Sequence, residues 1–264
     1  MLIDFHAHAF LDKLAAGAVA SLAAKAHIQP NSNGTVADTL RIMREQKVDR
    51  SVILSIAVSP RTEHHVNDFA ISLLQEPKFI PFGSVHPDSP NAISELKRLK
   101  SAGICGVKFH NEYQNFYVDD ERAFPIYEKC AELGLIMLFH GGADLGFAPP
   151  VKTPPKRMRR VCLTFPEAKI VVAHLGGQRM EEEAAEYLAD TNAYIDTSYA
   201  ATAASPEVGM RTILAFGFDR VLFGTDLPWD TAAHTLSYLE SMGFTEEQKE
   251  KIYCRNALRL LGLQ

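Results

Sequence analysis

Eight short apolar segments recur along the chain, and segments with helical periodicity separate them. Several read as nearly continuous apolar runs, such as SVILSIA, LIMLF and KIVVAH, which is typical of parallel strands buried on both faces. We expect strands at Leu2–His6, Arg50–Ile56, Phe79–Val85, Gly103–Phe109, Leu135–His140, Lys169–His174, Ala193–Thr197 and Arg220–Gly224. Eight strands that alternate with helices predict an α/β fold, a closed (β/α)8 TIM barrel rather than an open doubly wound sheet.

The segments between the strands are amphipathic. In Thr35–Gln46, apolar Val36, Leu40 and Met43 share one face and charged residues occupy the other. The same pattern predicts helices at Ala92–Ala102, Ala123–Leu133, Met180–Ala189, Pro206–Phe216 and Glu246–Leu261. We interpret Phe10–Asn33 as an excursion over the end of the first strand and the polar stretch around His64 and His65 as a solvated loop. No low-complexity linker interrupts the chain, so residues 1–264 are expected to form a single domain.

Charge and cysteine usage exclude several classes of function. The net charge of −5 leaves no basic surplus for phosphates, which argues against nucleic acid as a partner. The basic run KTPPKRMRR at 152–160 is interpreted as a solvated loop and helix start, with a role in binding an anionic substrate as the alternative. Four scattered cysteines predict reduced thiols and a cytoplasmic protein, and no apolar run is long enough to span a membrane. The oligomeric state is open, with a homodimer as the commonest closed form.

Imidazoles and a carboxylate follow the predicted strands. The first strand leads into His6-Ala7-His8, and because strand residues alternate, both histidines point to one side. The other strand-end groups are His110 after strand four, His140 after strand five, His174 after strand six and Asp226 after strand eight. Chemistry in such barrels takes place at the carboxyl ends of the strands. A set of nitrogen and carboxylate groups without thiolate therefore predicts a site for zinc, manganese or iron(II).

This pattern resembles the amidohydrolase superfamily, in particular the amidohydrolase-related (amidohydrolase 2) branch. That branch includes aminocarboxymuconate semialdehyde decarboxylase and pyrone dicarboxylate lactonase. The resemblance rests on the His-x-His of the first strand, the histidines after strands five and six, and Gly224-Thr225-Asp226 after strand eight. It covers essentially the whole chain, and it is far more specific for the superfamily than for a substrate.

The resemblance implies a ligand set and two catalytic roles. His6, His8, His140 and Asp226 would bind one divalent ion, with zinc as the first expectation and manganese or iron as alternatives. Asp226 would also take the proton of an attacking water, and His174 would stand beside the substrate oxygen. Asp4 shares the face of the His-x-His, which leaves open whether it lies near the site or has a structural role.

Four further residues are candidates for substrate binding: Lys108, His110, His86 and Trp229. If Lys108 faces the barrel interior, it is either carboxylated and bridges a second ion or remains a cation that binds a substrate carboxylate; an ordinary structural ion pair is the third reading. A lysine at this position is absent from the decarboxylases of the branch and therefore favours a hydrolase.

Three functions remain as hypotheses. The first is a metal-dependent hydrolase of a small-molecule ester, lactone or amide, in which metal-activated water attacks the carbonyl. The alternative is a metal-dependent non-oxidative decarboxylase of an aromatic or enoic carboxylic acid, with the same ligands. The third is a non-catalytic barrel that binds a ligand, which predicts a broken ligand set.

Overall fold

The parallel strands close into a barrel, and all but β1 are shorter than the predicted apolar runs. The computed structural model describes residues 1–263. Strands β1–β3 form one sheet and β4–β8 a second. Backbone bonds join the two sheets on both sides, from Lys108 N to Gly83 O (2.8 Å) and from Phe5 N to Phe223 O (2.7 Å). The strands are β1 Ile3–Ala7, β2 Arg50–Leu54, β3 Phe79–Phe82, β4 Gly106–Phe109, β5 Ile136–Phe139, β6 Ile170–Val172, β7 Tyr194–Asp196 and β8 Val221–Leu222. The predicted TIM barrel is confirmed.

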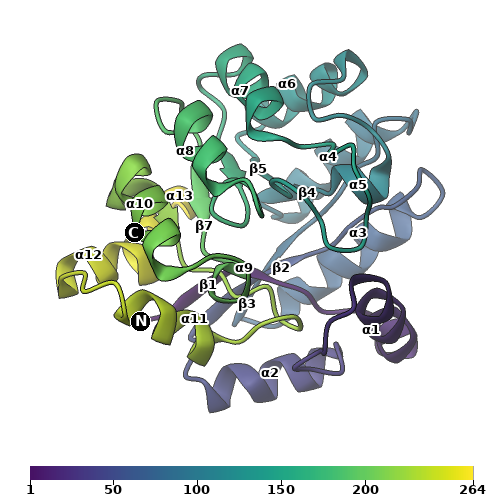
Figure 1. Cartoon of the computed structure of the whole chain (residues 1–264). Helices are drawn as coiled ribbons and strands as arrows, with labels where there is room; N and C mark the ends of the chain where they lie inside the picture. The colour runs from purple at the N-terminus through teal and green to yellow at the C-terminus, as the bar shows by residue number, and fades with distance from the viewer. Residues whose placement is uncertain (264) are drawn as a thin grey trace.

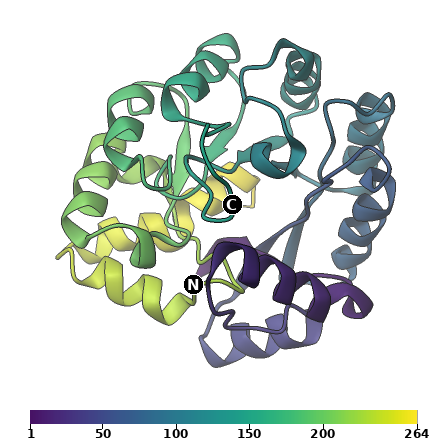
Figure 2. The ribbon, with the colours of Figure 1, turned by 45° about the vertical axis from the view of Figure 1, so that its right-hand side comes forward.

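Helices surround the barrel on its outside (Figures 1 and 2). The longer helices are α1 Asp12–Ala26, α2 Val36–Glu45, α3 Glu63–Ser72, α4 Ala92–Ala102, α6 Phe124–Glu132, α7 Pro155–Thr164, α8 Glu181–Leu188, α10 Pro206–Phe216 and α11 Ala232–Glu240. The shorter ones are α5 Asn111–Gln114, α9 Ala200–Ala203, α12 Glu246–Glu250 and α13 Asn256–Leu261, with a π-helical turn at Lys251–Arg255. Within residues 1–263, no helix combines the length and apolarity needed to cross a bilayer.

Several helices lie in segments that we did not predict as helical, namely α1, α3, α5, α9 and α11. The excursion after β1 contains α1, whose alanine-rich sequence lacks the clear two-faced pattern of an amphipathic helix. The stretch around His64 and His65 is wrong as a loop, because it starts α3. This helix is polar at its start and buries only a narrow face, with Asn67 and Ala70 inside. Its apolar signal was therefore too weak to predict a helix.

The side chains of each strand divide between two cores. Ile3, Phe5 and Leu138 belong to the cluster inside the barrel, whereas Val107 and Phe109 belong to the cluster between strands and helices. Lys108, between the latter two, therefore faces the barrel interior, and its side chain is 1% exposed. In β1 the register shifts between Asp4 and Ala7. Such an irregularity changes which side chains face inward. Phe5 and His6 are consecutive, yet both face the barrel interior.

Close packing between β3 and β4 gives a stability prediction. A Cβ added at Gly106 would lie 2.3 Å from the buried ring of Phe82. Gly106→Ala is therefore expected to lower the free energy of unfolding by about 1–3 kcal/mol. At Gly17 in α1 no atom lies within 4 Å of an added Cβ. Gly17→Ala should instead raise it by about 0.5–1 kcal/mol. Urea unfolding followed by circular dichroism measures both, and a Gly106→Ala protein as stable as wild type would contradict this packing.

Candidate metal centre and substrate pocket

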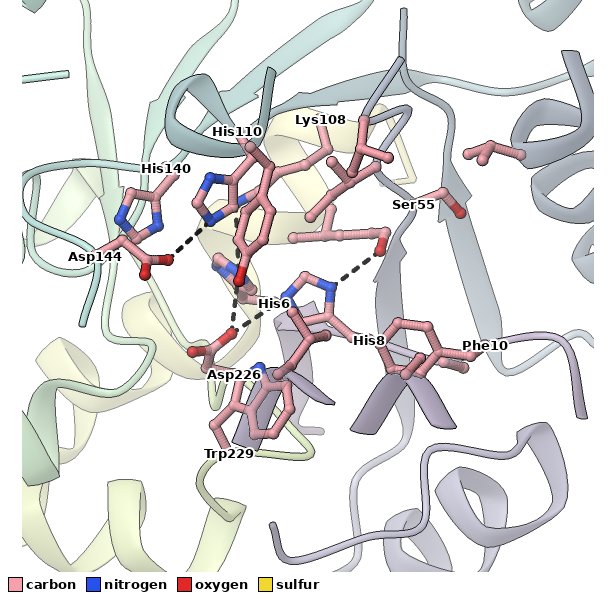
Figure 3. Close-up of a pocket in the computed structure, with 18 of the residues that line it drawn as sticks. His6, His8, Phe10, Ser55, Lys108, His110, His140, Asp144, Asp226 and Trp229 are labelled. Atoms are coloured by element: carbon pink, nitrogen blue, oxygen red, sulfur yellow. Dashed lines mark hydrogen bonds and ion pairs between the residues drawn. The ribbon is translucent and has the colours of Figure 1, made fainter. Parts of the chain in front are cut away.

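A pocket of about 400 Å³ opens at the carboxyl ends of the strands. Figure 3 shows polar side chains from several strands converging at its base. The sequence-predicted candidates that line it are His6, His8, Lys108, His110, His140, His174, Asp226 and Trp229. The predicted strand-end residues are thus assembled in one place.

His6, His8 and Asp226 form one group of potential metal ligands in this pocket. Oδ1 of Asp226 lies 3.3 Å from Nε2 of His6 and 3.2 Å from Nε2 of His8. Ligands at about 2.0–2.1 Å from a tetrahedral zinc ion lie about 3.3 Å from one another. Both distances from Asp226 therefore fit side chains that bind one divalent ion.

The outer nitrogens of both histidines are held by hydrogen bonds. Nδ1 of His6 lies 2.8 Å from Oδ2 of Asp196, and Nδ1 of His8 lies 3.0 Å from the carbonyl oxygen of Leu54. These acceptors place the ring proton on Nδ1 and leave the Nε2 lone pair for a metal. Burial lowers the pKa of His6 to about 3, an effect to which Lys108 adds. His6 is therefore neutral at physiological pH, as metal binding requires.

Asp226 is held next to the histidines by the backbone of the β8 end. Its amide donates to the carbonyl of His6 (2.7 Å), and its φ of +70° places it in the left-handed region. Burial acts to raise the pKa of Asp226, but the hydrogen bond with His8 and the nearby His6 and His174 outweigh it and lower the pKa to about 2. Asp226 is thus an ionised carboxylate, able to bind a cation and to accept a proton.

Asp4 has a structural position beneath this group. Its Oδ1 accepts from the amides of His6 (3.0 Å) and Thr225 (3.0 Å), and its Oδ2 accepts from the Thr225 hydroxyl (2.6 Å). The carboxyl therefore ties β1 to the β8 end. Of the two readings left open for Asp4, these contacts favour the structural one.

His140 stands slightly apart from the first group. Its Nδ1 lies 3.0 Å from Nε2 of His174, and its Nε2 is buried without a hydrogen-bond partner. Together with His110 and Asp144 it forms a second group whose potential ligand atoms lie within 4.8 Å of one another. Nε2 of His110 and Oδ2 of Asp144 are 3.2 Å apart. The unpartnered nitrogen of His140 marks it as an available ligand.

Lys108 places a cation at the base of the pocket. Its Nζ lies 3.5 Å from Nε2 of His6, and no ion pair to a carboxylate is found among the described residues. Burial lowers the pKa of Lys108 to about 8, although Asp196 and Asp226 act in the opposite direction. A buried cation without a paired carboxylate favours the binding of an anionic group over the structural ion pair.

One residue predicted from the sequence to bind substrate, His86, lies away from the pocket. His86 is buried beyond β3, where its amide donates to Glu63 (2.7 Å) and its Nδ1 accepts from the amide of Asp88 (3.2 Å). These contacts stabilise the local loop, so the structure does not bring His86 to the pocket lining.

Two residues of the site, Asp196 and Asp144, were not predicted from the sequence. Asp196 lies in one of the two predicted strands to which no polar role was given, and a carboxylate in a buried strand is the signal that could have identified it.

The His6–Asp196 contact leads to a prediction about metal affinity. Asp196→Asn removes the negative charge that orients the His6 ring but keeps the shape of the side chain at position 196. We expect the dissociation constant for zinc to rise about 10- to 100-fold, which is typical when the hydrogen-bond partner of a ligating histidine is lost. Competition against a chromophoric chelator measures it. Asp190→Asn, which changes an exposed partner of Arg159, should leave it unchanged. If Asp196→Asn and Asp190→Asn bind zinc with the same dissociation constant, Asp196 does not contribute to metal binding.

Comparison with known proteins places this fold and site in context. The model of a family described as "Amidohydrolase" matches residues 3–263. A curated relative, 2-amino-3-carboxymuconate-6-semialdehyde decarboxylase of Dictyostelium discoideum, is 26% identical over 236 residues, which cover 75% of this chain and 66% of the relative. The chain therefore spans slightly less than two thirds of the length of that relative.

Solved structures share the barrel over nearly the whole chain. A dihydroxybenzoic acid decarboxylase from Polaromonas, with bound manganese and an inhibitor, has a TM-score of 0.72, 17% identity and coverage of 99% of this chain and 97% of that one. A probable 2-pyrone-4,6-dicarboxylic acid hydrolase from Acinetobacter baumannii has a TM-score of 0.70, 16% identity and coverage of 99% of both. At these identities the likeness shows the fold alone.

Proposed function

The chain belongs to the amidohydrolase family, and we propose that it is a metal-dependent decarboxylase of a small aromatic or enoic carboxylic acid. The description of the curated relative and that of the manganese-bound neighbour support this proposal. It replaces hydrolysis as the leading hypothesis, since the sequence provided the same ligands for both reactions and favoured a hydrolase only through Lys108 and the short length of the chain.

The structural observation that supports a carboxylic acid as the substrate is the placement of Lys108. Its buried ammonium group lies beside His6 at the base of a pocket whose upper walls are mainly apolar, including Phe10, Phe69 and Trp229. A carboxylate next to Lys108 would lie against the proposed metal ligands, while a flat apolar body would contact the walls. A lysine is thus compatible with a decarboxylase, in which it holds the group that is lost.

His6, His8 and Asp226 are the proposed ligands of one divalent ion, and the unpartnered Nε2 of His140 is the proposed fourth. Neutral nitrogens and one carboxylate suit zinc, manganese or iron(II), and the manganese in the neighbouring structure supports manganese as much as zinc. When bound, such an ion withdraws electron density from substrate oxygens and so stabilises the negative charge that decarboxylation leaves behind.

The residues around the substrate have distinct proposed roles. Lys108 orients the carboxylate, whose bond to the ring or alkene carbon breaks as CO₂ leaves. The electron pair stays on that carbon, which then takes a proton from Asp226. Because the pKa of Asp226 is lowered to about 2, its carboxylate is ionised at rest. It therefore takes this proton from solvent, passes it to the carbon and is left ionised again. His174, whose Nδ1 lies 2.9 Å from the Ser198 hydroxyl, is held in position to stabilise charge on a substrate oxygen.

Removing and restoring the metal tests this function. We expect protein stripped with a chelator to release no CO₂ from a panel of hydroxybenzoic and muconic acids, and protein reloaded with zinc or manganese to release it. Headspace analysis measures the gas. If the stripped protein releases CO₂ as fast as the reloaded protein, the metal has no part in the reaction.

Hydrolysis is the second candidate, favoured by the neighbour described as a probable 2-pyrone-4,6-dicarboxylic acid hydrolase. In that reaction Asp226 would take the proton of the attacking water, and Lys108 would bind a carboxylate that remains in the product. Acid production from lactones and amides in a pH-stat, without CO₂ release from any carboxylate, would favour it.

A further inference from the structure

The outer part of the pocket has a larger apolar lining than the reaction at the polar base requires. Six residues from helix α1 and its flanks line this part, and none carries a charge: Leu11, Leu14, Ala18, Leu22, Ala26 and Ile28. The facing wall is also mainly apolar, with Ile56, Val58, Val66 and Phe69 beside Thr62 and His65.

Helix α1 presents two neighbouring apolar ridges. Ala15, Val19 and Ala23 are buried and pack against the barrel. Leu14, Ala18, Leu22 and Ala26 follow at the same four-residue spacing, but they line the pocket. At 1.5 Å per residue this second ridge extends over about 18 Å. It is therefore longer than a single ring bound at the polar base can cover.

The exposed apolar side chains of the molecule also gather here. Leu11 is 37% exposed, Leu14 56% and Val58 48%. They are three of the seven large hydrophobic residues that are exposed among residues 1–263. Apolar side chains left open to water beside a ligand pocket are a feature of surfaces that a ligand covers.

Contacts at both ends hold α1 in place beside the pocket. Before the helix, the amide of Phe10 donates to the carbonyl of Gly34 (2.8 Å). At its last turn, Nζ of Lys25 lies 3.3 Å from the ring centre of Phe147 and 4.7 Å from that of Tyr113. The helix is thus joined to α5 and to the segment after β5 through cation–π contacts, and the ridge is a fixed wall of the pocket.

From this continuity of polar base and apolar wall we propose that the substrate carries an alkyl or aryl arm, which extends from its acid-bearing ring or alkene along the Leu14–Ala26 ridge. The inference rests on the proposed function, because the acid group is what places the ring at the base. A cavity of about 400 Å³ lies in the range of about 300–1,000 Å³ that holds drug-sized ligands. The absence of charge on this wall selects an uncharged arm rather than a second carboxylate.

A series of benzoates tests the arm without turnover. Calorimetry on metal-loaded protein compares benzoate with its 3- and 4-ethyl, butyl and hexyl derivatives. In at least one of the two positions, Kd should fall about fourfold for each CH₂ group buried against the ridge. Ala18→Phe should abolish this gain for the hexyl compounds and leave the Kd of benzoate unchanged. Ala20→Phe, on the exposed face of α1, should retain the gain.

The outcomes separate this inference from the proposed function. A Kd independent of chain length, or an equal loss of the gain in Ala20→Phe, overturns the arm. So does light scattering that shows a dimer which Leu14→Glu dissociates, because a second copy then covers the ridge. If chain length strengthens binding but no carboxylate releases CO₂, the apolar subsite stands and the decarboxylase proposal fails. If short acids release CO₂ but chain length does not affect binding, the decarboxylase proposal stands and the apolar arm fails.

Discussion

Replacing Asp226 by asparagine is expected to lower kcat about 10²- to 10⁴-fold, the range that a positioned proton-transfer group contributes. The variant keeps the size of the side chain and an oxygen near His6 and His8, but it has no group that can carry a proton. In the native protein the lowered pKa of Asp226 keeps its carboxylate ionised and therefore able to accept a proton before it passes the proton on. The measurement is steady-state kinetics at saturating metal on the acid that the wild-type protein decarboxylates.

Metal content must be followed in the same variant, because Asp226 is also a proposed ligand. Elemental analysis of the protein used for kinetics separates lost metal from lost proton transfer. Asp219→Asn, which changes an exposed carboxylate that contacts Lys251, serves as the matched control and should keep the wild-type kcat. A metal-replete Asp226→Asn protein with the wild-type kcat would rule out proton transfer by Asp226.

Replacing Lys108 by methionine is expected to raise the Kd of benzoate about 30- to 1,000-fold. The fold-change corresponds to the roughly 2–4 kcal/mol lost when one partner of a buried charge pair is removed. Methionine nearly preserves the volume of the lysine stem. The free protein should become more stable, since the variant no longer buries an ammonium group without a paired carboxylate. Calorimetry measures binding, and urea unfolding measures stability.

This pair of readouts separates the possible roles of Lys108. A structural ion pair predicts lower stability with unchanged benzoate binding. A carboxylated lysine that bridges two ions predicts loss of a second ion from the wild-type metal content. Lys156→Met, on the exposed face of α7, should alter neither quantity. Only an anion-binding ammonium group predicts weaker binding together with higher stability.

The fold was predictable because buried parallel strands leave a strong local signal. Short apolar runs such as that ending at His140 are typical of strands covered on both faces, and a polar residue at the end of each run marks the catalytic end of a barrel. Strand ends were less accurate, because apolar residues continue past the last ladder bond: the run predicted at Arg50–Ile56 ends as a strand at Leu54. Helix α1 was missed because its alanines serve two apolar surfaces at once.

The site was predictable where a side chain sits at a strand end and not where it acts through another residue. His6 and His8 were identified by position, but Asp196 was not, because its contact with Nδ1 of His6 joins residues 190 positions apart. His86 has the same strand-end position as the pocket histidines, yet hydrogen bonds with neighbouring loops hold it away from them. Cytoplasmic location and a homodimer stay predictions.

Isotope labelling of the product tests the central claim, decarboxylation, most directly. Metal-loaded protein is incubated in water enriched in both deuterium and ¹⁸O, with the panel of carboxylic acids and, separately, with the lactones and amides. Mass spectrometry then reads the product after exchange back into ordinary water. We expect a product that has lost CO₂, retains one deuterium on the carbon that carried it and contains no ¹⁸O. A product that keeps all its carbon and gains one ¹⁸O, obtained only from the lactones or amides, would contradict decarboxylation.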